Sequence, residues 1–478
     1  MKIFLSLFVL PLFVSCSASY QERIAKTETA FYSGNYEEAI PDIREIVQDS
    51  ENKDRLLYLM EAGIIFHTKG DYEKSVIVFE QAEAIADTLQ VSALRQGLSF
   101  VMSDEEANFR GEDFERVLIK FYLGLNKLML KDHEASKRYF KKVEYELKEM
   151  KFSTASYRQN LLARYINAIV SEYLGKYNDA RVQYKLISQL NPEYKKVLGD
   201  RYILALKEKD LADQKEFAEG QNYIEAYDAG MQPIPYREGL AEVIIIHQAG
   251  KSAVKVSRGR LFEDKVFGPM LRSAIEGSLR MGGTGLSLGG VTAMFATAEN
   301  PIPKYETRDT ASAREGEVYI NGTSLGKTTV LNNYSETAIA SFEENYSEIV
   351  AKNVASIATK FVASAATAYA AKEAFKMSKS KGGKNKRDGA AMAGLELAGE
   401  VVGLAAGLVV SATMSTTIKP DLRCWRLIPS NFQVKRIFIE PGTYQFSLRN
   451  MGATVSNSPS VTETVEAGKP TFLSFRTF

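Results

Sequence analysis

The chain has 478 residues, 45% of them hydrophobic and 25% charged, which is ordinary for a protein that buries hydrophobic cores. These proportions exclude a globally disordered chain and a collagen. With 60 Lys and Arg against 59 Asp and Glu, the net charge is +1, so nucleic acid is not an expected partner. Three histidines and two cysteines are too few for the commonest zinc sites and His-based triads. We therefore expect no metal, no cofactor and no catalytic residue, although these counts leave a carboxylate-based enzyme open.

Residues 1–15 have the pattern of an export signal. Lys2 supplies the positive charge, and the apolar run over residues 3–14 is shorter than the roughly 20 residues of a permanent transmembrane helix. A small residue and then Cys16 follow, which resembles a bacterial lipobox, with two positions looser than usual. The pattern predicts cleavage before Cys16 and lipidation of its sulfur; the alternative is an ordinary signal peptide with an incidental cysteine. Ser17, by resemblance to other lipoproteins, favours the outer membrane.

Residues 16–215 contain three segments with one shared pattern, Gly-x-Tyr-x-x-(Ala/Ser). The glycine makes a tight turn between two antiparallel helices, the tyrosine begins the second helix, and the small residue lets the helices approach closely. The pattern resembles the tetratricopeptide repeat, a helix–turn–helix unit of about 34 residues. The sequence therefore predicts a TPR-like helical solenoid. The nine repeat positions are Gly34, Tyr36, Ala39, Gly70, Tyr72, Ser75, Gly175, Tyr177 and Ala180.

A degenerate unit lies between the second and third of these segments. It carries Gly124 and has His133 at the aromatic position, where we interpret the ring as a packed turn residue. An insertion around residues 88–116 accounts for the long spacing. We expect a helix over residues 111–130 with Asp113 as its N-cap. The acidic residues around Asp113 are explained by this helix start rather than by catalysis.

Residues 216–345 are predicted to form a β-rich mixed domain, because short β-rich runs replace the helical periodicity. The Gly-rich stretch 281–298 predicts a lid or an ordered loop. Residues 321–330 are similar to a phosphate-binding P-loop, but only three residues separate their two glycines where four are needed. Asn321 and Gly322 instead predict a β-hairpin turn, similar to turns in PEGA domains, which are small β-domains of surface proteins.

Two Ala-rich runs predict a helical hairpin over residues 346–418, joined by a basic, Gly-rich linker. Within it, residues 401–418 are uncharged but short for a membrane span. Acidic residues just before this stretch favour a packed soluble helix, with membrane insertion as the alternative. Close packing of the small residues makes a homo-oligomer possible.

Residues 419–478 are predicted to form a C-terminal β-domain. Asp421, Arg423 and Trp425 alternate, so on a strand they would share one face. We expect a buried Trp425 packed beside an Asp–Arg pair. Pro441-Gly442 predicts a turn between two strands. The whole chain is thus α+β: a TPR-like solenoid, an Ala/Gly-rich hairpin and short antiparallel β-domains.

The combination of these features is similar to one family of bacterial outer-membrane lipoproteins. The residues that carry the resemblance are the lipobox, the degenerate repeats, the GEDFERVL segment at 111–118, and the segment 421–429 before a Pro-Gly-Thr-Tyr turn. The resemblance implies N-terminal repeats, an α/β C-terminal region, and a location at the periplasmic face of the outer membrane. It implies no activity.

We expect a non-enzymatic scaffold that is anchored through Cys16 and whose repeats bind protein partners in the cell envelope. The alternative from another class is an envelope-polymer enzyme with two carboxylates about 5–9.5 Å apart in a cleft. A further alternative is self-assembly or membrane insertion through the hairpin 346–418.

Overall fold

A computed structural model describes ten ranges of the chain. Within this described part, no helix is both long and apolar enough to cross a membrane. Cys16 lies outside the described residues, as do most of the Gly-rich stretch 281–298 and residues 360–418 of the expected hairpin. The described ranges are 19–49, 53–96, 108–149, 160–282, 298–308, 311, 313–344, 346–359, 419–450 and 456–478.

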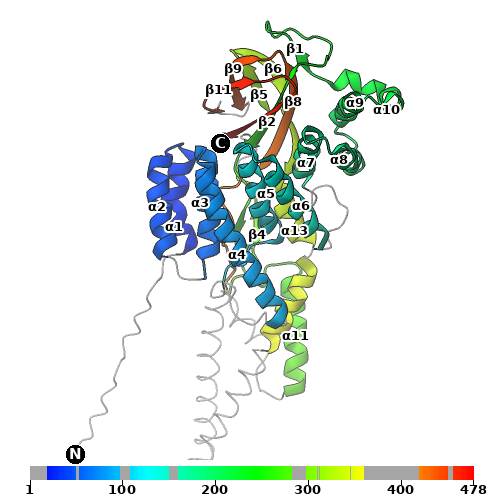
Figure 1. The fold of residues 1–478 in the computed structure, drawn as a ribbon. Coiled ribbons are helices and arrows are strands. Elements are labelled where there is room, and N and C mark those ends of the chain that lie inside the picture. Colours follow the sequence, from blue (N-terminus) through cyan, green and yellow to red (C-terminus); the bar gives the residue numbers. More distant parts are fainter. Residues whose placement is uncertain are drawn as a thin grey trace, which may run out of the picture.

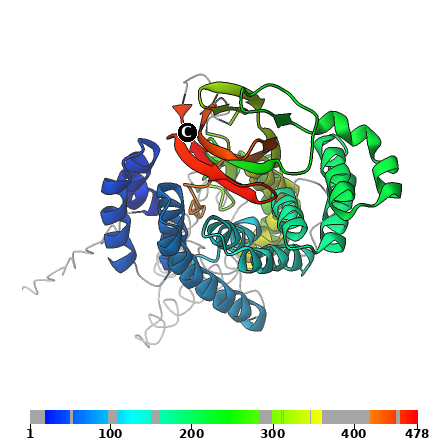
Figure 2. The ribbon, with the colours of Figure 1, turned by 45° about the horizontal axis from the view of Figure 1, so that its top comes forward.

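Within the described ranges of the N-terminal half, the helices form four pairs, and further helices follow them (Figure 1). This arrangement is the predicted TPR-like solenoid. Its helices follow an arc, and the strands lie on the inner side of that arc (Figure 2). The pairs are α1 (Tyr20–Tyr32) with α2 (Tyr36–Asp49), α3 (Arg55–Lys69) with α4 (Tyr72–Gln96), α5 (Asp113–Met129) with α6 (His133–Glu149), and α7 (Leu161–Tyr173) with α8 (Tyr177–Leu190); α9 (Lys196–Glu208), α10 (Leu211–Glu216) and the short 3-10 helix η3 (Ala218–Tyr223) follow.

The turns within the pairs use the left-handed backbone region. Gly34, Gly70 and Gly175 have φ of 74°, 89° and 69°, where a side chain would be strained. In the third pair the equivalent turn residue is Lys131, with φ of 62°. Gly124 therefore does not make the turn of the degenerate unit. It lies inside α5, where the ring of Phe140 occupies the space that a side chain would need.

The same close approach occurs in the second pair, which gives a testable prediction. A Cβ on Gly63 in α3 would lie 2.5 Å from the ring of Phe79, which is fully buried. Because that ring cannot swing into solvent, Gly63→Ala should lower the free energy of unfolding by about 1–3 kcal/mol. Gly277→Ala in α11 (Phe267–Gly282) is the control, since nothing lies within 4 Å of its added carbon. Urea unfolding followed by circular dichroism would measure both; equal stability of the two variants would contradict the packing argument.

The start of α5 differs from the predicted cap. Glu112, not Asp113, is the N-cap, and it forms a capping box with Glu115. Asp113 is the first helical residue and pairs with Arg116 at 2.5 Å. The prediction was one residue too late because an acidic side chain is also favourable in the first turn. The expected apolar face of this helix is buried: Phe114, Val117, Leu118, Phe121 and Leu125.

In the part of the chain that the structure describes, strands from before residue 346 and after residue 418 form two five-stranded sheets, which together we call the β unit. The first sheet has the order β1-β8-β2-β12, with β7 also paired to β8; β12 runs parallel to β2, and β1 runs parallel to β8. The second has the order β10-β9-β5-β6, with β11 also paired to β9. The strands are β1 (Ala226–Tyr227), β2 (Ala241–Ala249), β5 (Gly316–Ile320), β6 (Thr323–Lys327), β7 (Thr329–Asn333), β8 (Asn431–Ile439), β9 (Gly442–Asn450), β10 (Ser456–Asn457), β11 (Val461–Val465) and β12 (Pro470–Thr477).

The predicted ranges 216–345 and 419–478 therefore do not form two separate sheets, because each sheet contains strands from both. The turn at Pro441-Gly442 joins β8 to β9, and these strands belong to different sheets. Outside the β unit, β3 (Val254–Val256) and β4 (Lys304–Glu306) form a two-stranded ribbon, and α13 (Tyr334–Glu344) follows β7. Asn321 and Gly322 make the predicted hairpin turn between β5 and β6, both with positive φ.

The first sheet is covered on both faces, which places the largest core between the sheet and the helices. All nine residues of β2 and all nine of β8 are buried. Val243 and Ile245 of β2 pack in a core shared with the second sheet. Ile244 and Ile246, which point to the opposite face, join the core of the helical repeats. This explains why the middle of β2, residues 243–246, is a continuous apolar run without polar alternation.

Candidate functional site

Residues 419–430 form an irregular segment that leads into β8. It lies along α1, α3 and α5, the first helices of the first three helix pairs. We call it the docked segment. The predicted strand over Asp421, Arg423 and Trp425 is wrong, since residues 421–426 have no regular secondary structure. Cys424 and Trp425 are neighbours and are both 1% exposed. The alternation fails because Cys424 and Trp425, which would point to opposite faces of a strand, are both buried, so the burial does not alternate along the segment.

Two glutamates of the repeats bind the main chain of the docked segment. The carboxylate of Glu61 in α3 accepts hydrogen bonds from the backbone N–H of Arg426 at 2.7 Å and of Leu427 at 3.1 Å. Glu115 in α5 accepts one from the N–H of Trp425 at 2.7 Å. Both glutamates are buried. Their oxygens thus replace the partners that a β-ladder would supply to this stretch of backbone.

Three side chains of the docked segment add specific contacts. Trp425 packs its ring 5.9 Å from that of Phe79 and 6.0 Å from that of Tyr122. Arg423 pairs with Asp421 of its own segment at 2.7 Å. It also pairs with Asp54 of the repeats at 2.6 Å. Arg426 pairs with Glu28 of α1 at 2.7 Å. The predicted Asp–Arg pair and the buried tryptophan are therefore both present, and the repeats contribute the carboxylates of Asp54 and Glu28.

We define the inner face of the repeats as the side chains of α1, α3, α5, α7 and α9 that contact the docked segment or the β unit. On its first three helices the charged members are acidic, and they match the two arginines of the docked segment. Besides binding Arg426, Glu28 of α1 pairs with Arg308 at 2.5 Å. The acidic members there are Glu28, Glu61 and Glu115, and we include with them Asp54, the N-cap residue of α3.

Burial raises the pKa of the Glu61 carboxyl from 4.5 to about 7, although Tyr20 and the two backbone amides bond to it. The pKa of Glu115 is raised to about 7 for the same reason, desolvation. Each carboxyl therefore binds its proton more tightly in the folded chain than in the unfolded chain. The stability from this proton is complete below about pH 4.5 and is lost as the pH rises through about 7.

This linkage predicts a pH-dependent effect of Glu61→Gln. The stability of the wild type relative to the variant should fall by up to about 3 kcal/mol between pH 4.5 and 7, since one pKa unit corresponds to about 1.4 kcal/mol. Other titrating groups cancel in the difference. Denaturant unfolding of both proteins across this range would measure it. A difference that is constant with pH, or that grows as the pH rises, would contradict the raised pKa.

A second set of buried charges joins the later repeats to β8. The guanidinium of Arg436 lies 2.9 Å from Glu172 of α7, 2.8 Å from Asp200 of α9 and 2.8 Å from Glu242 of β2. Lys207 of α9 also pairs with Glu172, at 2.6 Å. Arg436 holds the pKa of Glu172 below its ordinary value, whereas burial raises the pKa of Asp200 to about 6. Three acidic groups and two basic groups thus lie together under the sheet.

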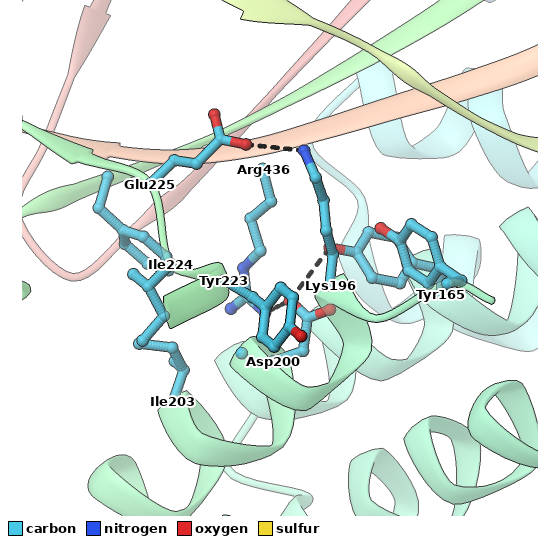
Figure 3. Close-up of a pocket in the computed structure, with 11 residues that line it drawn as sticks. Tyr165, Lys196, Asp200, Ile203, Tyr223, Ile224, Glu225 and Arg436 are labelled. Atoms are coloured by element: carbon cyan, nitrogen blue, oxygen red, sulfur yellow. Dashed lines mark hydrogen bonds and ion pairs between the residues drawn. The ribbon is translucent and has the colours of Figure 1, made fainter. Parts of the chain in front are cut away.

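A small cavity lies beside this cluster, between α9 and β8 (Figure 3). It encloses about 20 Å³, roughly the room for one water molecule. Glu172 and Asp200 both bond to Arg436, and their side chains are buried. This carboxylate pair is therefore closed to a polymer substrate. Residues that line the cavity include Tyr165, Lys196, Asp200, Tyr223, Glu225 and Arg436.

The three histidines have structural partners. His67 accepts a hydrogen bond from the Gln248 amide at 2.8 Å and donates one to Asn126 at 2.7 Å. Burial lowers its pKa to about 4 and that of His247 to about 3, so both are neutral at pH 7. His133 begins α6 and packs its ring 5.1 Å from the ring of Tyr173. Within the described ranges no cluster of His, Cys, Asp and Glu could hold a metal ion.

The nine repeat positions lie where the helix pairs meet rather than at a binding surface. The three glycines make the turns, and the three tyrosines begin α2, α4 and α8. Ala39, Ser75 and Ala180 are fully buried between paired helices. The sequence pattern did not single out Glu28, Asp54 or Glu61. A carboxylate inside an otherwise apolar helix, as at Glu61, is the signal that could have found the site.

No protein-family model matches the chain, and no curated protein matches it either. Solved structures that resemble it include MamA from Desulfovibrio magneticus RS-1, at 14% identity and a TM-score of 0.30, covering 42% of this chain and 92% of that one. A MamA RS-1 double mutant gives 15% and 0.31, covering 42% and 89%. TPR-like repeats of a Podosopora anserina protein described as a kinesin light chain give 13% and 0.31, covering 42% and 92%.

Proposed function

We propose that this protein is a non-enzymatic scaffold of the bacterial cell envelope, anchored through a lipid on Cys16, whose TPR-like repeats bind protein partners. One observation supports the binding role: the inner face of the repeats holds an irregular stretch of polypeptide, the docked segment, by its backbone amides, its arginines and its tryptophan. Curved arrays of helix pairs create extended surfaces suited to such binding. Anchoring rests on the sequence before Ser17, which lies outside the described residues.

The lipid anchor is tested by Cys16→Ser. A thioether lipid with further acyl chains supplies at least two anchors, and two anchors make membrane attachment stable where one is marginal. We expect the variant to lose fatty-acid labelling and to leave the membrane fraction. Its repeats and β unit should stay folded, because the described cores begin at Tyr20. Cys424→Ser is the control, since its buried thiol is out of reach of a lipidating enzyme. A labelled, membrane-bound Cys16→Ser protein would overturn the anchor and make residues 401–418 the next candidate.

The interaction role is tested by cross-linking in intact cells, followed by mapping of the cross-linked residues. We expect cross-links to envelope proteins within residues 19–208, the range of the helix pairs and α9. Cross-links confined to the β unit would show that the repeats are not the binding module.

Light scattering of the non-lipidated protein, with and without residues 346–418, tests the separate prediction of self-assembly. If the partner is a second copy of this chain, the protein should be an oligomer with residues 346–418 and a monomer without them.

A further inference from the structure

The docked segment is held in the manner of a bound peptide. The main chain of residues 425–427 bonds to side chains: Glu61 and Glu115 accept from its three N–H groups, and the hydroxyl of Tyr32 donates to the carbonyl of Arg426 at 2.8 Å. A strand of the sheet would satisfy these groups through a neighbouring backbone. Side-chain partners can bind any chain that presents the same groups, whatever its connection to the β unit.

The composition of the contact is also that of a recognition surface. Buried carboxylates cost desolvation energy. An apolar segment of similar shape would therefore hold the repeats and the β unit together at least as well. Aromatic and arginine side chains in desolvated pockets are the usual anchors of protein interfaces. Trp425 is 1% exposed between two aromatic rings, and the side chains of Arg423 and Arg426 are 6% and 17% exposed on acidic partners.

We propose that the docked segment is an internal ligand, and that the surface beneath it binds a partner segment with the pattern Arg-x-Trp-Arg or a close basic–aromatic–basic equivalent. The segment now in place indicates the chemistry of that occupant: its backbone amides lie on Glu61 and Glu115, and its arginines lie on Asp54 and Glu28. A partner segment gains access when residues 419–427 leave the inner face. Residues 428–430 stay in place, because Ile428 and Ser430 form backbone hydrogen bonds with Ser252 at 3.1 Å and with Ala249 of β2 at 2.9 Å, and β8 stays in the sheet. This inference deepens the proposed function and rests on the repeats being its binding module.

The probe is a fluorescein-labelled peptide with the sequence of residues 419–430, and the readout is fluorescence anisotropy with the full-length, non-lipidated Cys16→Ser chain. The double variant Trp425→Ala, Arg426→Ala weakens the internal ligand and leaves the inner face unchanged. Since apparent affinity scales with the fraction of open sites, this variant should bind the peptide at least about tenfold more tightly than its parent. Adding Glu61→Gln and Glu115→Gln should remove that gain. A peptide with alanine in place of the tryptophan is the matched control and should not bind.

Equal peptide binding by the parent and the double variant would overturn the proposal, as would binding that survives loss of both glutamates. If the double variant fails to fold, hydrogen exchange on the parent decides. The amides of residues 425–427 should then exchange by a local opening, at least about tenfold faster than those of β8. Exchange of both at one rate would mean that the segment leaves only on global unfolding, which contradicts an exchangeable ligand. Because these tests use purified protein, they fail or succeed independently of lipid anchoring and of any envelope partner.

Discussion

Replacing Arg436 by methionine is expected to lower the free energy of unfolding by about 3–5 kcal/mol. The guanidinium is the shared partner of Glu172, Asp200 and Glu242. Its side chain is 4% exposed, and those of the three carboxylates are 0%, 6% and 7% exposed. Removing the cation leaves a surplus of buried negative charge, which is far more costly than losing a surface pair.

Denaturant unfolding of wild type and Arg436→Met, followed by circular dichroism, would measure this loss. Lys176→Met is the matched control, because Lys176 pairs with Glu134 and both side chains are about half exposed, at 43% and 53%. That surface pair should contribute little to stability, because both groups are solvated and screened. Similar losses in the two variants would show that the Arg436 cluster does not stabilise the junction between the repeats and the sheet.

Trp425→Ala should also cost about 3–5 kcal/mol, because it empties the largest fully buried side-chain volume in the described chain. The cavity would lie between Phe79 and Tyr122, whose rings also pack on each other at 5.5 Å. Those rings belong to α4 and α5, so the loss falls on the contact between the repeats and the docked segment. Trp425→Phe should retain most of the stability, since it keeps an aromatic ring in the pocket.

Thermal unfolding by calorimetry suits this variant, since Trp425 is the only tryptophan and its fluorescence is lost with it. Tyr145→Ala in α6 is the control for removing an aromatic side chain, because Tyr145 is 66% exposed. It should change stability by no more than about 0.5 kcal/mol. A Trp425→Ala protein as stable as this control would mean that the docked segment contributes no packing energy to the fold.

The two interfaces have a functional consequence. Arg436 lies within β8 and links the later repeats to the first sheet. Trp425 and Arg426 lie on the docked segment and link that segment to the earlier repeats. The first interface is part of a continuous strand and is expected to be permanent. The second is held by side chains at residues 425–427, and this is the part that a partner can replace. Residues 428–430 bond to neighbouring backbone and stay in place. Stability measurements on Arg436 and binding measurements on Trp425 therefore test different properties of the same inner face.

The sequence by itself determined the local structure. Gly34, Gly70 and Gly175 are at turns with positive φ, where glycine is favoured because it lacks a Cβ, and this identified three helix pairs directly. Asn321-Gly322 identified the hairpin between β5 and β6 for the same reason. Such features depend on backbone sterics over a few residues, so they can be recognised without knowing the rest of the fold.

Only the tertiary structure decided how the two halves meet. Glu61 and Arg426 are far apart in the sequence, and nothing near either residue indicates that one binds the other. The same holds for Arg436 and its three carboxylates, which come from α7, α9 and β2. The pattern of Asp421, Arg423 and Trp425 suggested a strand because alternation assumes one covered face. Burial of both Cys424 and Trp425, which would point to opposite faces of a strand, removes that assumption. A buried charge is tolerated where a distant partner neutralises it, and the fold alone brings that partner into place.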